Sequence, residues 1–170
     1  MGIKIPLYNQ SQNTIMKNLL MFALLFISAF GFSQSNKEEV DLFQALYGKD
    51  KKSLVAEFIK PDAARKDAFW KLYDEYETER KDIGKSKIGL LEKYAMNYGT
   101  MDEAMMDDIM NEMIDLSSKT DKLQASYYGK IKKAAGTKVA SQFLQLESYL
   151  TAAIRTAVLE EIPFIGELEK

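Results

Sequence analysis

Residues 94–109 read YAMNYGTMDEAMMDDI, and this stretch decides the fold because it separates two long runs of helical periodicity. Gly99 and Thr100 interrupt the period near its centre. Thr100 is followed three residues later by Glu103, the spacing of a capping box, in which each side chain accepts a hydrogen bond from the other residue's backbone N–H. The stretch therefore predicts a turn between two long helices.

The run before this turn has large side chains at intervals of three and four residues, the period of an amphipathic helix. They are Phe69, Tyr73, Tyr76, Ile83, Leu90, Tyr94 and Tyr98, with Arg80 and Lys87 in the same register. The pattern predicts one helix from Asp62 to about Tyr98, with Pro61 in its first turn, where proline is tolerated. If this helix bends, we expect the bend at Gly84 or Gly89.

Two more helices are expected after the turn. The first, from Met101 to Ala135, continues the period through Met106, Ile109, Met113, Leu116, Thr120, Leu123, Tyr127 and Ile131. Gly136 and Thr137 separate it from a last helix that starts near Val139 and ends at Pro163. Because only two or three residues connect these helices, consecutive helices must run antiparallel.

Two short amphipathic helices are predicted before the long ones, at residues 38–47 and 51–59. No strand pattern or phosphate-binding loop occurs in the chain. We therefore expect an all-α fold: an antiparallel hairpin of long helices, a C-terminal helix packed along it, and short N-terminal helices. Residues 34–170 have the usual size of one domain.

The N-terminus has the three parts of a signal peptide. Lys17 precedes fourteen uncharged residues, LLMFALLFISAFGF at 19–32, which are too few to span a bilayer. Gly31 and Ser33 supply small side chains before a cleavage site expected between Ser33 and Gln34. Met16 is the expected start of translation, since the residues before it fit no part of a signal peptide. Residues 1–33 are thus assigned as signal peptide and the mature protein as periplasmic or secreted.

The composition removes several classes of activity. The chain has no His and no Cys, which excludes Ser-His-Asp triads, thiol nucleophiles and the usual zinc ligands. Without Lys4 and Lys17 the mature chain keeps 21 basic against 25 acidic side chains, a net charge of −4. Nucleic acid is therefore not an expected partner. We expect a protein that is not an enzyme, has no cofactor and contacts the membrane only through its signal peptide.

Methionines give the first candidate partner-binding site. All six that follow the signal peptide lie between Met96 and Met113. The candidate residues are Met101, Met105, Met106, Met110 and Met113. Flexible, polarizable thioethers suit a surface that adapts to several apolar partners, and they also bind copper(I). A third interpretation is that these side chains fill a loosely packed helix end. The interleaved carboxylates lack the spacing of a calcium loop, so no metal site is assigned.

Aromatic residues give the second candidate. Trp70, Tyr73 and Tyr76 would form either a partner-binding surface or, at their helical spacing, part of the core. Glu147 and Arg155 lie on one face of the last helix and are expected to have a structural role, with Arg155 paired to Glu75 or Glu79 across the bundle.

Two blocks resemble a known family. Residues 58–80, FIKPDAARKDAFWKLYDEYETER, are similar to the helix-opening segment of Spy/CpxP-like (LTxxQ-motif) periplasmic proteins, with Ile59-Lys60-Pro61-Asp62-Ala63 in place of Leu-Thr-Pro-x-Gln. Residues 138–165, KVASQFLQLESYLTAAIRTAVLEEIPFI, resemble the closing helix of related, uncharacterised exported proteins.

The resemblance implies a helical periplasmic protein that binds unfolded or envelope polypeptides, as a holdase-like chaperone or an envelope-stress adaptor. A metal-responsive module built on the methionines and carboxylates is the alternative. A homodimer would cover the apolar face that a thin helical layer leaves.

Overall fold

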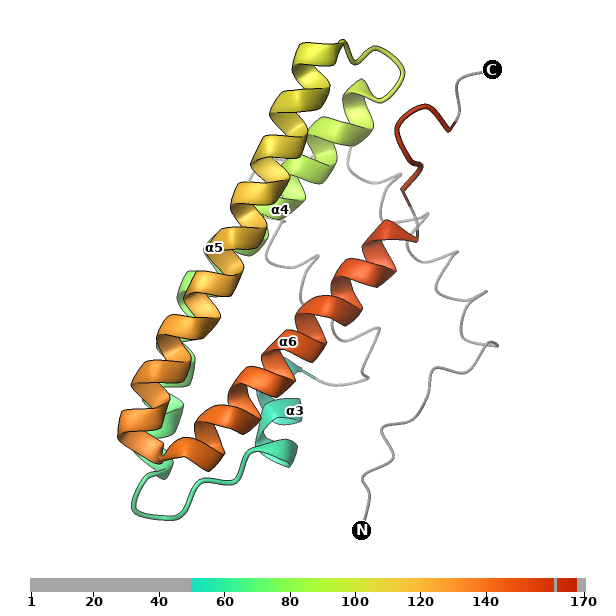
Figure 1. Cartoon of the computed structure of the whole chain (residues 1–170). Helices are drawn as coiled ribbons and strands as arrows, with labels where there is room; N and C mark the ends of the chain where they lie inside the picture. The colour runs from blue at the N-terminus through green and yellow to red at the C-terminus, as the bar shows by residue number, and fades with distance from the viewer. Residues whose placement is uncertain (1–49, 161, 168–170) are drawn as a thin grey trace, which may run out of the picture.

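A computed structural model describes residues 50–160 and 162–167, and these form four helices without a strand (Figure 1). The helices are α3 (Lys51–Phe58), α4 (Lys66–Asn97), α5 (Glu103–Ala135) and α6 (Thr137–Leu159). The expected all-α fold is confirmed. The signal peptide, its cleavage site and the helix expected at 38–47 lie outside the described residues.

The start of α4 differs from the prediction. Pro61 lies in a non-helical segment, and α4 begins at Lys66 instead of Asp62. Asp62 Oδ1 accepts a hydrogen bond of 3.1 Å from the Arg65 amide, and the Asp62 carbonyl accepts a second one. Asp62 therefore closes a turn that precedes the helix, and the connection between α3 and α4 is longer than expected.

The turn at the tip of the hairpin also differs in detail. Asp102, not Thr100, is the N-cap of α5, because its side chain accepts a hydrogen bond of 2.8 Å from the Met105 amide. Thr100 instead donates its hydroxyl to the Asn97 carbonyl at 3.3 Å. At the other end of α5 the turn is tighter than predicted, with Gly136 alone between α5 and α6.

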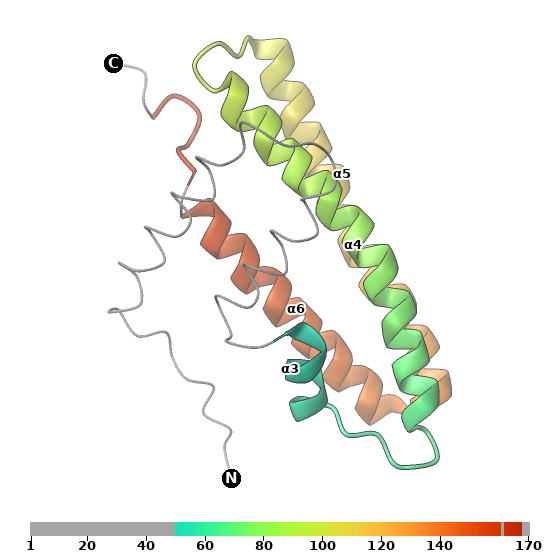
Figure 2. The same ribbon diagram turned by 180° about the vertical axis from the view of Figure 1, so that it is seen from behind.

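α4 and α5 form an antiparallel hairpin, and α6 returns along α5 (Figures 1 and 2). Both views show α6 close to the hairpin near Gly136 and diverging from it toward its own C-terminal end. The segment after α6 returns to α4, where Tyr94 and Tyr98 donate their hydroxyls to the carbonyls of Pro163 at 2.7 Å and Phe164 at 2.5 Å.

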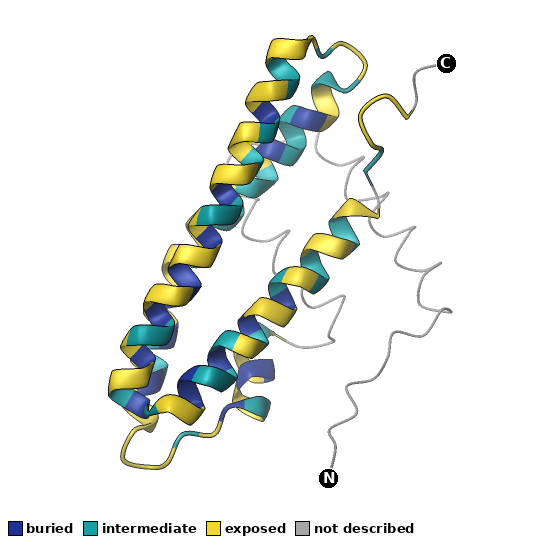
Figure 3. Ribbon diagram, viewed as in Figure 1, coloured by how far each residue is buried: buried dark blue, intermediate teal, exposed yellow. Residues whose placement is uncertain are grey.

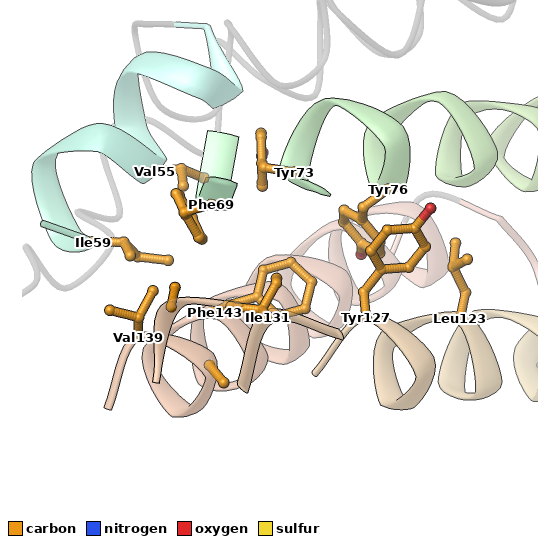
Figure 4. Close-up of a cluster of buried hydrophobic side chains, with 12 residues drawn as sticks. Val55, Ile59, Phe69, Tyr73, Tyr76, Leu123, Tyr127, Ile131, Val139 and Phe143 are labelled. Atoms are coloured by element: carbon orange, nitrogen blue, oxygen red, sulfur yellow. The ribbon is translucent and has the colours of Figure 1, made fainter. Parts of the chain in front are cut away.

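The main core lies where all four helices meet, and the buried stripes of the helices face each other there (Figure 3). Figure 4 shows its side chains: Val55 and Ile59 from α3 and its C-cap, Phe69, Tyr73 and Tyr76 from α4, Leu123, Tyr127 and Ile131 from α5, and Val139 and Phe143 from α6. The core includes the Tyr76 ring in edge-to-face contact with Phe143 at 5.0 Å and with Tyr127 at 5.5 Å. These pairs join α4 to both of its neighbours.

Candidate partner-binding surface

A second, smaller cluster holds the tip of the hairpin together. Its buried members are Leu90, Tyr94, Ile109 and Leu116, which come from α4 and α5 alone. Around them pack partly buried side chains: Ile83, Tyr98, Met101, Met105, Met110 and Met113. We call this group the tip cluster. Four of the five candidate methionines therefore help to cover a core while keeping part of their surface in solvent.

Three methionines share one side of α5. With 3.6 residues per turn, Met106, Met110 and Met113 lie within roughly 60° of arc, and all three are half-buried. Gln124 lies on the same side farther along α5, where its amide donates to Thr151 Oγ1 of α6 at 3.0 Å. We call Met106, Met110 and Met113 the methionine flank. The flank lies on the side of α5 that α6 covers nearer Gly136, but closer to the tip of the hairpin.

Other apolar side chains at the tip of the hairpin are more exposed than the flank. Ile114, on the next position of α5, is 62% exposed, and Met96, at the end of α4, is 72% exposed. Met106 does not pack against the tip cluster, unlike the other four candidate methionines. Apolar area thus reaches solvent at the tip of the hairpin, whereas the same side of α5 is packed where α6 lies against it.

Carboxylates surround these side chains. Between Tyr98 and Leu116 the sequence has six acidic residues and no Lys or Arg, and all six carboxylates are exposed. They are Asp102, Glu103, Asp107, Asp108, Glu112 and Asp115. Lys93 of α4 bonds to Asp108 at 2.7 Å and to Glu112 at 3.4 Å, and these contacts raise the Lys93 pKa, chiefly through the hydrogen bond to Asp108.

Two of the three aromatic candidates, Tyr73 and Tyr76, belong to the core. Tyr73 and Tyr76 are buried to 1% and 0% exposure, so neither can contact a partner without unfolding of the core. Trp70 is half-buried, with its ring 5.0 Å from Phe69 and 5.5 Å from Tyr73, and the Lys52 ammonium lies 5.4 Å above it. Of the two interpretations of these residues, the core one is confirmed for both tyrosines.

Glu147 is the most buried charged side chain of the described residues, at 1% exposure. Its Oε2 accepts hydrogen bonds of 2.7 Å from both Lys51 Nζ and Tyr76 Oη. Lys51 also bonds to Glu77 at 2.6 Å, and Glu77 bonds to Arg80 at 2.8 Å. We call Lys51, Tyr76, Glu77, Arg80 and Glu147 the buried polar network. It ties α3, α4 and α6 together.

Arg155 does not take part in this network. It is exposed, and no ion pair joins it to Glu75, Glu79 or Glu147 within the described part of the chain. Glu79 instead accepts the Tyr127 hydroxyl at 2.7 Å. Glu147 therefore has a structural partner on α3, whereas the expected ion pair of Arg155 with Glu75 or Glu79 is not formed.

Lys51 is not among the site residues predicted from the sequence, although the chain carries a signal for it. Lys51 is the first residue of a helical stripe with i, i+3, i+4, i+7 spacing, and the other three members, Leu54, Val55 and Phe58, are apolar. A cation on an apolar stripe must snorkel or find a buried anion. Glu147 gives the same signal on α6, because it is a charged residue between Phe143 and Leu150 on the buried stripe.

Burial and charge act in opposite directions on the Glu77 pKa. Burial raises it, but the Lys51 and Arg80 cations outweigh that effect and hold the pKa below its ordinary value. Burial also raises the pKa of Tyr73 and Tyr76 strongly, with the nearby Glu77 and Glu147 charges adding to it. Both hydroxyls therefore stay neutral over the physiological range.

Within the described residues, no group of three or more His, Cys, Asp or Glu side chains is arranged to hold a metal ion. None of the helices described has the length and hydropathy that crossing a membrane requires. Comparison of the chain with models of known protein families, with curated proteins and with solved structures found no match. The resemblance to Spy/CpxP-like proteins therefore stays an expectation from two sequence blocks.

Proposed function

We propose that this protein is an exported, non-catalytic polypeptide-binding protein that uses the tip of its hairpin, as a holdase-like chaperone or an envelope-stress adaptor in the periplasm. The observation that carries the proposal is the methionine flank, half-exposed beside Ile114 on a side of α5 that α6 covers only nearer Gly136.

The chemistry of methionine supports this use. Its unbranched side chain has three rotatable bonds and a polarizable sulfur, so a group of methionines can repack around apolar partners of different shape. Met110 and Met113 of the flank pack against the buried cluster that contains Leu90 and Tyr94 of α4 and joins α4 to α5. The surface thus combines adaptable side chains with a fixed backbone, which limits the ordering cost of binding.

Export is the second part of the proposal and rests on the sequence. The apolar run at 19–32, the preceding Lys17 and the small residues before Gln34 make up a signal peptide. The absence of Cys means that the fold does not depend on the redox state of the compartment in which it works. N-terminal sequencing of the protein recovered from the periplasm tests this part: Gln34 as the first residue is expected, and an uncleaved chain would contradict it.

Aggregation of a heated client enzyme, followed by light scattering, tests the binding function. We expect the chain from Gln34 onward, which retains every described core residue, to suppress aggregation at near-stoichiometric ratio without ATP. The triple variant Met96→Gln, Met106→Gln, Ile114→Gln removes exposed apolar area at the tip and is expected to lose most of this effect.

The matched control changes exposed apolar side chains on α6. Tyr149 and Leu159 are 45% and 40% exposed, and the variant Tyr149→Gln, Leu159→Gln is expected to keep the activity. Absence of suppression with several clients, or equal losses in the two variants, would contradict binding at the tip. Circular dichroism melting curves establish that both variants are folded.

Copper(I) binding is a second candidate function, favoured by the placement of Met106, Met110 and Met113 on one side of α5. Soft thioethers select copper(I) over harder cations. The variant with Leu at these three positions keeps the apolar surface and removes the sulfurs. Competition with a chromophoric copper(I) chelator is expected to show sub-micromolar binding that this variant lacks, and affinity weaker than micromolar in the unchanged protein would dispose of this function.

A further inference from the structure

We infer that the methionine flank binds a positively charged, amphipathic helical segment of a partner protein. This inference rests on the proposed function and adds the chemical class of the partner. Three observations carry it: the apolar stripe, the distribution of charge beside it, and the charge of the other segments that could cover it.

The stripe has the length and spacing of a helix-binding site. Met106, Met110 and Met113 follow each other at intervals of four and three residues, and Ile114 extends the apolar surface outward at 62% exposure. From Met106 to Ile114 the helix rises by roughly 12 Å. That is about two turns, which matches a partner helix with apolar residues at i, i+3 or i+4, and i+7.

Negative charge lies along the outer edge of this stripe. Glu103 and Asp107 project from the same side of α5 as Met110 and Ile114, at about 100° per residue. Within the described residues neither is within ion-pair distance of a Lys or Arg. In the described part of the chain, Asp107 accepts a hydrogen bond from the Asn111 amide, at 3.0 Å.

On the opposite edge of α5, by contrast, the carboxylates form ion pairs with lysines. Asp108 and Glu112 share Lys93, and Asp115 pairs with Lys119 at 2.7 Å. The uncompensated charge of the tip is therefore concentrated on the edge that borders the methionine flank. Lys or Arg residues on the polar face of a partner helix would lie against this edge and speed association.

Two other occupants carry the wrong charge. A second copy of the chain would bring the same carboxylates against each other across a symmetric contact. Residues 34–49 carry Glu38, Glu39 and Asp41 against Lys37 and Lys49, a net charge of −1, so this segment does not complement the acidic edge either. Charge complementarity favours a basic partner over both.

Fluorescence anisotropy with two designed peptides tests the inference on the chain from Gln34 onward. Both are labelled fourteen-residue amphipathic helices with the same Leu face, and one carries Lys where the other carries Glu. We expect the Lys peptide to bind at least about tenfold more tightly at low salt, and high salt to remove most of the difference because screening shortens the reach of exposed charges.

Neutralising the acidic edge gives the decisive comparison. The variant Glu103→Gln, Asp107→Asn is expected to weaken binding of the Lys peptide by about fivefold, as two exposed charge contacts would. The control Asp67→Asn, Glu75→Gln removes the same charge at the far end of the hairpin, where both side chains are exposed, and should leave the affinity unchanged.

Other outcomes of these binding measurements would contradict the inference, and they separate it from the proposed function. Equal binding of the two peptides, equal losses in the two variants, or a dimer that must dissociate before the peptide binds would overturn the basic-partner inference while leaving polypeptide binding in place. Failure of both peptides to bind would overturn the inference and count against the proposed function as well.

Discussion

At the level of single residues, Glu147 is the most buried charged side chain in the described part of the chain. A carboxylate at 1% exposure needs a cation and further hydrogen bonds to offset its desolvation. Lys51 and Tyr76 supply these at Oε2, while Oε1 of Glu147 and the hydroxyl of Tyr73 are buried with no hydrogen-bond partner among the described residues. Two neighbouring tyrosines on α4 are therefore in opposite situations, one satisfied and one not.

Removing each tyrosine hydroxyl in turn is expected to give different results. Tyr76→Phe leaves Glu147 with one fewer donor and should lower the free energy of unfolding by about 1.5–3 kcal/mol, the range for a bond to a charged group. Tyr73→Phe removes an unpaired buried polar atom and should be neutral or stabilising by up to about 1 kcal/mol. Urea denaturation of both variants measures the difference, and equal destabilisation would contradict the assignment of hydrogen bonds.

At the level of helices, Gly136 makes the sharp connection between α5 and α6. Its φ of 91° and ψ of 163° belong to a backbone region that is essentially restricted to glycine. A Cβ added there would also lie 2.8 Å from Arg65 Nη1. By contrast, Gly129 is inside α5, where an added Cβ meets no atom within 4 Å. One glycine is thus required by geometry, whereas the other only weakens its helix.

Alanine substitution separates these two roles. Gly136→Ala should destabilise the protein by about 1–3 kcal/mol, the cost of holding a non-glycine residue in that conformation. Gly129→Ala should stabilise it by about 0.5–1 kcal/mol, because alanine favours the helix interior. Thermal unfolding followed by circular dichroism reads both changes. A stable Gly136→Ala protein would show that the α5–α6 connection has another conformation.

The long helices could be predicted from the sequence, because apolar residues at intervals of three and four over about thirty residues fit few structures other than a helix. Their ends could not be predicted as well. Thr100 and Asp102 are both good caps, and only the position of the Met105 amide selects Asp102. Pro61 is compatible with a first turn or an extended approach to it, and the hydrogen bonds of Asp62 decide for the second.

The candidate sites, like the helices, could be predicted from the sequence only in part. The methionines at the tip could be found from their concentration alone, but their placement on one side of α5 beyond the reach of α6 depends on where α6 diverges. Tyr73 and Tyr76 have the same spacing in a core as on a surface, so the sequence left both interpretations open. The pairing of Lys51 with Glu147 spans 96 positions and requires the fold to be known.

At the level of the whole molecule, the buried polar network makes stability depend on pH. The pKa of Glu77 lies below its ordinary value of 4.5 in the folded protein. A carboxylate with a lowered pKa contributes stability that is present above pH 4.5 and is lost as the pH falls through its folded value. The hydrogen bond from Ser53 lowers the pKa of Asp50 below 3.8 and acts in the same direction.

We therefore expect the free energy of unfolding to fall as the pH is lowered from about 5 toward 3, at up to about 1.4 kcal/mol per pH unit for each proton taken up. Glu77→Gln should be less stable at neutral pH and should lose part of this slope, whereas Glu75→Gln, on the exposed side of the same helix, controls for the loss of one charge. Urea denaturation at several pH values provides the measurement, and an unchanged slope in Glu77→Gln would contradict the role given to the network.

The central claim is that the tip of the hairpin binds polypeptides, and the methionines allow it to be tested directly. Every methionine after Ser33 lies between Met96 and Met113, so ¹³C labelling of methionine methyl groups places all probes at the tip. On addition of an unfolded client, we expect the Met106, Met110 and Met113 signals to shift or broaden, with Met106 affected more than the tip-cluster residue Met101. Signals that stay unchanged at client concentrations that saturate binding would contradict it.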